Sequence, residues 1–379
     1  MPQTSSSLCP GTQTLIVGGG IIGLSLAWEL STRGRRVVVI DAQGIGRGAS
    51  WAGAGILPPT ATCPQADDYE NLRALSHRLH PLWAKRLRQS TGIDTGLRRC
   101  GGVYLARSPA EMATLTANQL WWQMQQIEYQ QWTMSELAQR EPSLGRPEDP
   151  IRGAWFLPDE YQLRNPRHLQ ALAAACQQQG VQLIEAAAME SLEIAGGAVE
   201  GVTTARGRIT AEQVCICSGA WARLALEQLN IANGILPVRG QIVLYRCPQP
   251  PIHSVINEGH RYLVAREDGH LLAGSVEEEV GYHIHTTAEA LAQIRGWAEQ
   301  ILPSLKQCPV EKCWAGLRPG SFDGLPYLGR VPGIDNLFLA AGHYRNGLHL
   351  SCATAVVLAN EMLQLPNDID LHPFRVGRG

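Results

Sequence analysis

A short apolar run that leads into a glycine-rich turn near the start of the chain constrains the fold most strongly. Residues 14–18 read TLIVG, which is typical of a buried parallel strand. The residues that follow, Ile21 to Arg33, predict a helix that ends at Gly34. A second apolar run, residues 36–40, predicts the next strand. Together these segments predict a βαβ unit, and with it a parallel sheet covered by helices.

The turn in this unit has the spacing Gly18-x-Gly20-x-x-Gly23, and Asp41 closes the second strand. In a dinucleotide-binding turn the first glycine makes the bend, the second lets the backbone approach a pyrophosphate, and the third lets helix and strand pack closely. The helix directs its free N–H groups at the phosphates, and Asp41 can bind a ribose hydroxyl. The alternative is a turn that binds nothing, but the strand, the helix and the acid together favour a dinucleotide site.

Two further loops of small residues favour FAD over NAD as the dinucleotide. Residues 46–56, GRGASWAGAGI, can return along the pyrophosphate towards a flat isoalloxazine ring. Residues 342–347, GHYRNG, precede the last predicted helix, whose N–H groups could stabilise negative charge at the N1/C2=O edge of a reduced flavin. An NAD enzyme does not need this third element, so we expect FAD.

Two arginines near the end of the chain, Arg318 and Arg345, stand among glycines and apolar residues instead of in a charged run. A planar guanidinium in such a setting matches a carboxylate through two hydrogen bonds. We therefore expect a clamp for a small acid. Alternatives remain open. Either arginine could pair with a carboxylate of the protein, and Tyr262 could pack within its strand. His260 and His343 favour packing over a role as bases.

Composition excludes several other classes of protein. The 379 residues are 45% apolar and 17% charged, which supports a large core and argues against disorder. The formal net charge of -2, without a block of Lys or Arg, makes nucleic acids and anionic membranes poor candidate partners. The 10 cysteines contain no Cys-x-x-Cys pair, so we expect reduced thiols, no metal site and a cytoplasmic protein. Residues 1–13 lack the apolar core of a secretory signal, and the run Ile21–Leu30 is too short to span a bilayer.

The middle of the chain predicts helices and short strands. Residues 68–140 have a helical pattern, and the tryptophans near Leu120–Trp132 are interpreted as packing or as a contact between subunits. Asn165 is expected to cap a helix that has Pro166 at its first position. Strands are expected at residues 181–184, within 191–210 and at 213–217, and residues 218–221 open another helix.

A switch to strand-like alternation at residues 238–276, with a turn at Glu267–Gly269, marks a second part of the molecule. The run Glu277–Glu279 is interpreted as a solvated hairpin end, and a helix follows at about residues 287–301. A strand at 336–340 and a helix from Gly347 to about Leu363 return to the first part.

We therefore expect an α/β fold of two interleaved domains. A Rossmann-like FAD-binding domain would contain residues 1–85, 150–232 and 320–379. An α+β substrate domain, built on an antiparallel sheet, would contain residues 86–149 and 233–319.

With these segments in hand, the chain resembles the D-amino-acid-oxidase superfamily of FAD-dependent oxidoreductases, and within it the glycine oxidases of thiamine biosynthesis. The resemblance covers nearly the whole chain. Its most specific segments are GGGIIG, GASWAGAGIL, NPRHL, WAGLRPGSFDGLPYLGR and AAGHYRNG. It implies FAD bound non-covalently. Some relatives that oxidise sarcosine attach the flavin through a cysteine at a position like Cys313, but the GLRP that follows here is the form found in glycine oxidases.

The resemblance also implies roles for single residues. Arg318 would hold the substrate carboxylate, Tyr262 would bond to it or shape the pocket, and Arg345 would lie near both flavin and substrate. The backbone of Met189, at the end of the strand that follows Gly180, would touch the adenine side. The other FAD contacts would come from Gly18, Gly20, Ile21, Ile22, Gly23, Asp41, Ala42, Ala49, Ser50, Ala54, Gly55, Ile56, His343, Tyr344, Asn346, Gly347, Leu348 and His349.

The reaction implied is oxidation of the amine of glycine, sarcosine or a small D-amino acid by O2. Its products would be an imine or glyoxylate, ammonia and hydrogen peroxide. The imine, dehydroglycine, would go to a thiazole synthase, and the protein would be a homo-oligomer, a tetramer. A broader D-amino acid oxidase or dehydrogenase is the main alternative. A non-catalytic or tRNA-modifying FAD module is another, but the chain has neither a basic patch nor a methyltransferase domain.

Overall fold

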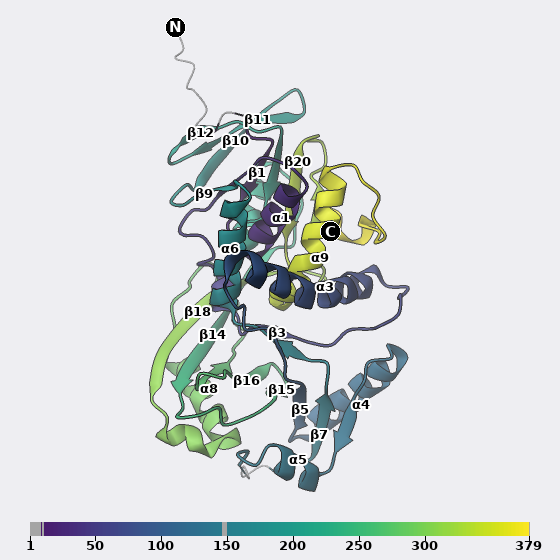
Figure 1. Ribbon diagram of the computed structural model, residues 1–379, viewed down its shortest axis with the longest axis vertical. Helices are drawn as coiled ribbons and strands as arrows, with labels where there is room; N and C mark the ends of the chain where they lie inside the picture. The colour runs from purple at the N-terminus through teal and green to yellow at the C-terminus, as the bar shows by residue number, and fades with distance from the viewer. Residues whose placement is uncertain (1–8, 10, 146–149, 379) are drawn as a thin grey trace.

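Two sheets, one in each half of the molecule, organise the fold (Figure 1). The computed structural model describes residues 9, 11–145 and 150–378. Most of residues 1–13, which bear on the expectation about a secretory signal, lie outside the described residues, as do 146–149. Within the described part, no helix is long and apolar enough to cross a membrane.

The first sheet contains the predicted βαβ unit. Its strand order is β19-β20-β13-β1-β2-β9, and all neighbouring pairs are parallel except β19 with β20. This order brings together segments from both ends of the chain. The inner strands are short and, apart from Gln213 at the start of β13, fully buried, as the apolar runs predict. The strands are β1 (Thr14–Val17), β2 (Val37–Ile40), β9 (Gln182–Ile184), β13 (Gln213–Ile216), β19 (Tyr327–Arg330) and β20 (Leu337–Ala341).

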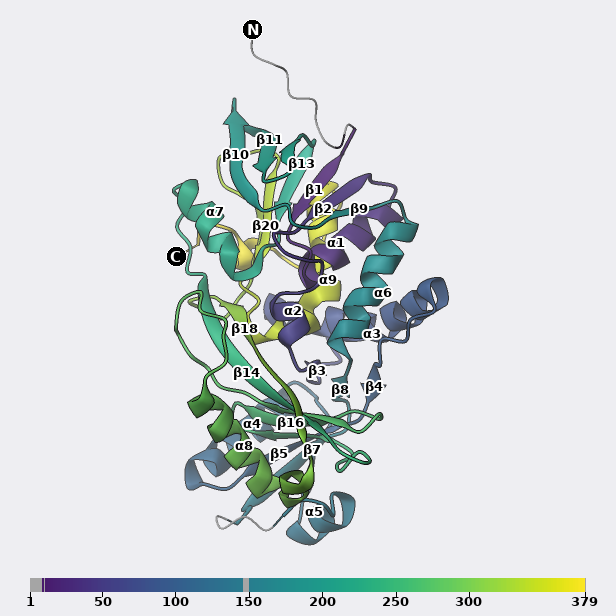
Figure 2. The same ribbon diagram turned by 90° about the vertical axis from the view of Figure 1, so that its left-hand side faces the viewer.

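Helices cover one face of this sheet and a small antiparallel sheet lies on the other side (Figure 2). Helix α1 (Ile21–Thr32) is apolar all round and ten of its twelve residues are buried, because it packs between the sheet and other helices. Those helices are α3 (Asp68–Thr91), α6 (Asn165–Gln178) and α9 (Gly347–Met362). The other face carries α7 (Ala222–Gln228), β10 (Met189–Ala195), β11 (Ala198–Thr204) and β12 (Gly207–Ile209).

The second sheet has eight strands in the order β18-β14-β17-β16-β15-β5-β7-β6. It is antiparallel throughout except for the parallel pair β5–β15. Two long strands, β14 and β18, run from this sheet towards the first half (Figure 2). The strands are β5 (Gly102–Ala106), β6 (Gln130–Trp132), β7 (Gly153–Leu157), β14 (Leu236–Arg246), β15 (Val255–Glu258), β16 (Arg261–Ala265), β17 (His270–Gly274) and β18 (Val310–Gly320).

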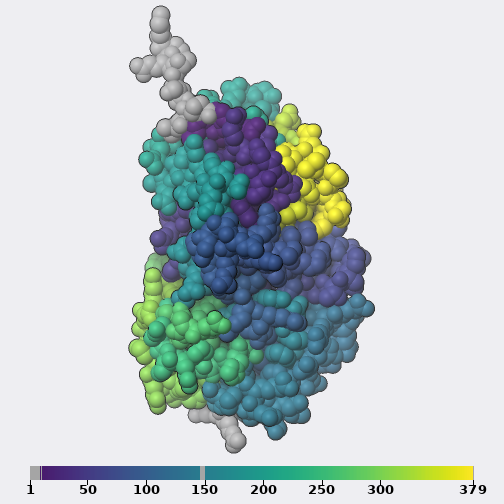
Figure 3. Space-filling model, in the orientation of Figure 1, coloured from purple at the N-terminus to yellow at the C-terminus, as the bar shows by residue number. Residues whose placement is uncertain are grey.

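Three helices cover the second sheet, and short elements join the two halves. Helices α5 (Met134–Arg140) and α8 (Ala288–Ile301) pack on one face, and α4 (Pro109–Met124) packs on the other near β5 and β7. Helix α3, dark blue, crosses the middle of the face seen in Figure 3. The short elements are α2 (Ala49–Ala52), β3 (Ile56–Leu57), β4 (Arg98–Arg99), β8 (Tyr161–Gln162), η1 (Gly219–Trp221), η2 (Pro303–Gln307), η3 (Tyr344–Asn346) and η4 (His372–Phe374).

Several local predictions were wrong. Residues 68–140 contain three helices, but β4, β5 and β6 interrupt them. Asn165 is not the N-cap of α6: Arg164 holds that position, and the Asn165 side chain instead donates to Ser50 O at 2.7 Å. Met189 begins β10 instead of ending β9. The packing role predicted for the tryptophans is confirmed for Trp122 and Trp132, which are buried.

The two-domain division remains a proposal, and the structure argues against two of its boundaries. The boundary at 85/86 lies within α3, which packs along α9 and α6 in the first half. The boundary at 149/150 assigns β7 to the FAD-binding domain, whereas β7 pairs with β5 and β6 in the second sheet. We propose that the division falls after α3 and after β7.

Candidate active site

A cavity of about 740 Å³ lies between the two sheets and brings most of the predicted site residues together. The glycine turn after β1, the loop around α2 and the loop before α9 form its first-half wall. Strands β14, β16 and β18 form the wall on the side of the second sheet. The predicted residues that line it are Gly18, Gly20, Ile21, Ile22, Asp41, Ala42, Ala49, Ser50, Ala54, Gly55, Ile56, Met189, Tyr262, Arg318, His343, Tyr344, Arg345, Asn346, Gly347 and Leu348.

The glycine turn has the close approaches that its pattern predicts. Gly18 has φ +114°, and a Cβ there would lie 2.5 Å from the carbonyl oxygen of Cys217 on the neighbouring strand. Gly23 does not line the cavity; a Cβ on it would lie 1.9 Å from Gly18 O, so its role is to let α1 pack against the turn. The N-terminus of α1 has no side-chain cap on Gly20. Apart from Ile21 N, which donates to Ser50 Oγ, the N–H groups of its first turn therefore fit a pyrophosphate.

Two side chains hold this cradle in shape. Asp41 Oδ2 accepts from Gly19 N at 2.8 Å, and Ser50 Oγ accepts from Ile21 N at 2.9 Å. Asp41 lies at the carboxyl end of β2 and lines the cavity, where it can meet a ribose hydroxyl. Ser50 comes from the second small-residue loop, so this loop closes over the first turn. The residues present thus fit the pyrophosphate and ribose of an FAD.

A buried arginine ties the second small-residue loop to the large sheet. Arg266, at the tip of the β16–β17 hairpin, donates to Ala54 O and to Gln162 Oε1, both at 2.6 Å. Burial lowers the pKa of Arg266 to about 10. Because Ala54 O lies in the cavity wall, the position of this wall depends on the hairpin.

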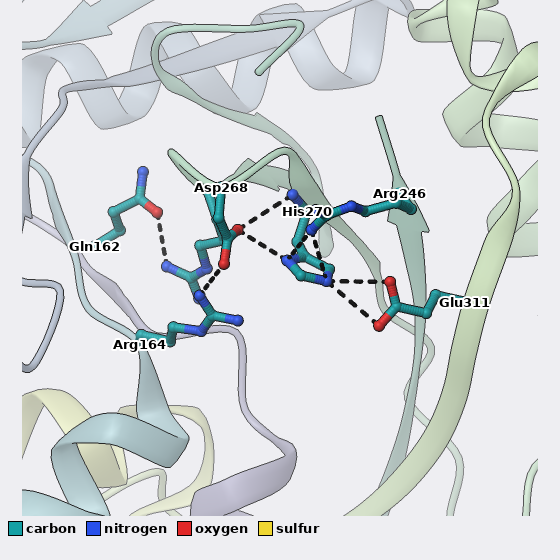
Figure 4. Close-up of polar contacts among 7 residues, drawn as sticks. Gln162, Arg164, Arg246, Asp268, His270 and Glu311 are labelled. Carbon is teal, nitrogen blue, oxygen red and sulfur yellow. Dashed lines mark hydrogen bonds and ion pairs between the residues drawn. The ribbon is translucent and has the colours of Figure 1, made fainter. Parts of the chain in front are cut away.

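A polar network fixes the same hairpin (Figure 4). Asp268 forms an ion pair with Arg164, the N-cap of α6, and lies 2.8 Å from His270 Nδ1. His270 Nε2 lies 3.1 Å from Glu311 Oε2 on β18. Burial raises the pKa of Asp268, but the hydrogen bonds from Arg164 and His270 outweigh it and hold that pKa well below its ordinary value.

Arg318 occupies the side of the cavity formed by β18. Its Nη1 donates to Val276 O at 3.0 Å and its Nη2 donates to Ser275 Oγ at 2.5 Å. Both acceptors are neutral, and among the described residues no carboxylate forms an ion pair with Arg318. Gly240 on the neighbouring β14 makes room, since a Cβ there would lie 2.3 Å from Arg318 Nη2. The guanidinium is therefore fixed in place by neutral acceptors, and within the described residues no carboxylate lies close enough to form an ion pair with it.

Tyr262 is buried on β16, and its ring depends on a second glycine. Gly274 is its cross-strand partner on β17, and a Cβ on Gly274 would lie 2.7 Å from the Tyr262 hydroxyl oxygen. The ring lines the cavity and packs with Ile242 and Leu272. Its position suits both alternatives that the sequence left open, packing and contact with a substrate.

Arg345 is paired with a carboxylate of the protein, as one of the alternatives from sequence expected. Its Nη1 lies 3.0 Å from Glu277 Oε1 and its Nη2 donates to His260 O at 3.0 Å. Tyr344 also donates to Glu277, at 2.8 Å. Burial opposes ionisation of Glu277, but Tyr344 and Arg345 hold its pKa below the ordinary value. In the run at 277–279, predicted to be solvated, Glu277 is exposed as expected and also pairs with Arg345, whereas Glu278 is half-buried and pairs with Arg239 at 2.9 Å.

Two predicted histidines are buried, and they differ in location. His343 lines the cavity and its Nε2 lies 3.1 Å from Thr354 Oγ1; burial lowers its pKa to about 3, which excludes it as a base near neutral pH. His349 does not line the cavity. It lies on α9 against His77 and His80 of α3, with ring centroids 5.6 and 6.2 Å away. Within the described residues, no such cluster has the geometry of a metal site.

Sequence reasoning missed several residues of the cavity wall. Tyr104 on β5 and Asn257 on β15 lie at its far end, and Ser275 holds Arg318. Cys313, raised as a point of attachment for flavin, does not line the cavity. The alternation of β15 and β16 could have placed Asn257 and Tyr262 on one face. The pairing of β15 with β5, however, joins segments about 150 residues apart, for which the sequence has no local signal.

Comparisons with known proteins identify the relatives of this chain. The family model of DAO, FAD dependent oxidoreductase, matches residues 13–361. A glycine oxidase of Pseudomonas putida is 34% identical over 96% of this chain and 97% of its own length. The bifunctional protein ThiO/ThiG of Synechocystis is 34% identical over 96% of this chain, which spans 53% of that longer protein.

Solved structures match as well. The crystal structure of glycine oxidase from Geobacillus kaustophilus has a TM-score of 0.91 and 31% identity, with 97% of this chain and 98% of that chain covered. An iminodiacetate oxidase from Chelativorans, at 24% identity and a TM-score of 0.85, shares the fold. The predicted fold class, the FAD cofactor and the oxidoreductase activity are therefore confirmed. With nearly the whole chain matched by the family model and the glycine turn, second loop and α9 loop lining one cavity, this chain belongs to the DAO family of FAD dependent oxidoreductases.

Proposed function

We propose that the chain oxidises the amine of glycine, and of sarcosine and other small amino acids, next to a carboxylate. One molecule of glycine and one of O2 would give the imine, dehydroglycine, and hydrogen peroxide; water then converts the imine to glyoxylate and ammonia. The observation that carries this proposal is the fixed Arg318 guanidinium without an ion pair in the cavity. The glycine oxidases among its relatives support it.

In this proposal Arg318 binds the substrate carboxylate through two hydrogen bonds, which fixes the α-carbon relative to the ring of FAD. Asp41, Ser50 and the N-terminus of α1 would hold FAD non-covalently, and the bound FAD would supply a hydride acceptor for this carbon. Tyr262 borders the substrate and adds a hydrogen bond from its hydroxyl. Arg345 is neutralised by Glu277, so we assign it a supporting role, in which its charge and the α9 loop border flavin and substrate.

The proposal is tested by peroxide release from the purified flavoprotein with glycine, sarcosine and D-alanine, in the wild type and in Arg318→Ala. The substitution should raise KM for glycine by at least tenfold, because the loss of a charged two-bond contact costs roughly 2–5 kcal/mol. Arg88→Ala is the matched control: Arg88 is an exposed α3 arginine that pairs with Asp94 and does not line the cavity, so it should leave KM unchanged. Unchanged glycine kinetics in Arg318→Ala would refute the proposal.

The substrate panel separates this proposal from a broader D-amino acid oxidase or dehydrogenase. Activity on glycine comparable to that on D-alanine supports the glycine oxidase. Activity confined to larger D-amino acids supports the broader enzyme, and flavin reduction without peroxide indicates an acceptor other than O2.

We further propose that a thiazole synthase receives the imine. The support is the fusion named ThiO/ThiG in Synechocystis and in Trichormus, in which a segment similar to this chain makes up about half of the protein. Adding a separately purified thiazole synthase should then lower the glyoxylate released per peroxide formed. We also propose a homo-oligomer, which light scattering of the purified holoenzyme tests directly.

A further inference from the structure

Glu160 is a fully buried carboxyl group behind the far wall of the cavity. Its Oε2 accepts from the Tyr104 hydroxyl at 2.6 Å and its Oε1 accepts from Asn257 Nδ2 at 3.1 Å. Tyr104 and Asn257 line the cavity and Glu160 does not. This carboxyl group is thus joined to the cavity wall by hydrogen bonds from a phenol and an amide that line it.

The register of the large sheet aligns these groups with the substrate side of the cavity. Tyr104 on β5 pairs with Asn257 on β15, and Asn257 pairs with Tyr262 on β16. Cross-strand partners point to the same face of a sheet, so the three side chains form one row. Tyr104 and Asn257 therefore continue the row that Tyr262 begins beside the substrate.

The chain makes room for this carboxyl group and leaves it without a cation. A Cβ on Gly102 would lie 2.4 Å from the Glu160 carboxyl carbon, and Glu160 O accepts from Cys100 N and Gly101 N at 3.1 and 3.0 Å. Among the described residues, no arginine, lysine or histidine pairs with Glu160. A buried carboxylate without a counter-charge holds a proton more readily than an exposed one.

The surroundings of Glu160 set its protonation near neutrality. Burial raises its pKa to about 7, against the opposing effect of the hydrogen bonds from Tyr104 and Asn257. Cys100, between β4 and β5, is the ionisable group beside it, and the charges of Arg73 on α3 and Arg345 on η3 act on Tyr104. A group that can both gain and lose a proton near pH 7 is matched to proton transfer.

We propose that Glu160, acting through Tyr104, takes the proton that the substrate ammonium group must lose before its carbon can be oxidised. This inference rests on the proposed amine oxidation. An N–H bond of the ammonium breaks and its proton goes to the Tyr104 phenolic oxygen, while the Tyr104 proton moves to Glu160 Oε2. The products of the step are a neutral amine, a neutral tyrosine and a protonated Glu160. No electrons are transferred in this step.

The test is the pH profile of anaerobic flavin reduction by glycine in the wild type, Glu160→Gln and Tyr104→Phe. In the wild type the second-order rate should fall as the pH drops below about 7, because Glu160 then already carries a proton. At neutral pH, the rate of flavin reduction in each variant should be roughly 10²-fold lower than in the wild type. The pH below which this rate falls should rise to the pKa of the free substrate amine. Measuring KM and kcat separately distinguishes a loss of proton transfer from a loss of carboxylate binding, because the latter would raise KM alone.

Glu141→Gln is the matched control, since Glu141 is also buried but accepts from His253 N and Ser254 N, away from the cavity. Its profile should coincide with that of the wild type. As a second readout, the infrared band of a protonated carboxyl group should titrate near pH 7 in the oxidised wild type and be missing in Glu160→Gln.

The outcomes distinguish the inference from the function on which it rests. If glycine does not reduce the flavin of the wild type, the proposed function is contradicted. If glycine reduces the wild-type flavin normally and the rate of both variants falls at the same pH as that of the wild type, the role of Glu160 is overturned. The proposed function then stands. If Glu160→Gln does not fold, Tyr104→Phe alone decides, because it keeps the buried carboxyl group in place.

Discussion

Gly240→Ala should disable Arg318 without touching it. An alanine Cβ at position 240 would lie 2.3 Å from Arg318 Nη2 and 2.5 Å from its Cζ. Restoring an ordinary contact of about 3.4 Å requires the guanidinium to retreat by about 1 Å, that is 3.4 minus 2.3. A misplacement of this size costs roughly 10²-fold in rate, or about 2.7 kcal/mol. We expect kcat/KM for glycine to fall by this factor, mainly through KM.

The fold should tolerate the same substitution. The clashing atoms are the end of a flexible side chain, and alanine is favoured over glycine in a strand interior by roughly 0.5–1 kcal/mol. The midpoint of thermal unfolding should therefore stay unchanged or rise slightly. Gly296→Ala on α8 is the control, because a Cβ there meets nothing within 4 Å; it should leave the kinetics unaltered.

The decisive assay is peroxide release over a range of glycine concentrations, combined in a double-mutant cycle. If Gly240→Ala acts through Arg318, adding it to Arg318→Ala should have almost no further effect. Wild-type KM in Gly240→Ala would refute the reasoning. So would effects of the two substitutions that add independently.

Three further predictions use the same structure. Gly274→Ala places a Cβ 2.7 Å from the Tyr262 hydroxyl oxygen and should raise KM for glycine in the peroxide assay; an unchanged KM would mean that the ring is free to move. Burial lowers the pKa of His168 to about 3, so the unfolded state binds more protons between pH 6.5 and about 3 and stability falls on acidification. Between pH 7 and 5, the melting temperature of His168→Leu should therefore fall less than that of the wild type, and an equal fall contradicts this. The pKa of Glu160 is raised from 4.5 to about 7, so the native state binds more protons in this window and stability falls as pH rises; Glu160→Gln should remove roughly 3 kcal/mol of this dependence in urea titrations at pH 5 and 8.

The parts of the fold that the sequence predicts well are those fixed by neighbours along the chain. The strand–helix–strand unit has the predicted elements within one to two residues, because the glycine turn needs Gly18 at positive φ and Gly23 against Gly18 O. The hairpin at 267–269 is local as well: Gly269 N donates to Arg266 O at 3.0 Å. In these segments, sequence neighbours supply both the constraint and the partner.

The errors arose where a distant contact overrules a local preference. Asn165 followed by a proline is a good helix start, but its side chain is used by Ser50, 115 residues away. Strand β5 lies in a stretch with helical spacing and is held by β7 and by the parallel β15. The row of Tyr104, Asn257 and Tyr262 depends on the same pairing, so neither Tyr104 nor Glu160 behind it could be identified before the sheet was known.

The two arginines show most clearly what the structure adds. In the sequence Arg318 and Arg345 have similar surroundings, and both were expected to bind a carboxylate. The two arginines differ in their partners from one short segment after β17. Ser275 and Val276 offer Arg318 neutral acceptors, and Glu277 neutralises Arg345. Since neighbouring residues of one segment contact the two guanidinium groups, a movement of this segment would change the proposed carboxylate site and the Arg345 ion pair together. In the proposed site, the position of Glu277, and not the glycines around either arginine, thus distinguishes the arginine assigned to the substrate from the one paired within the protein.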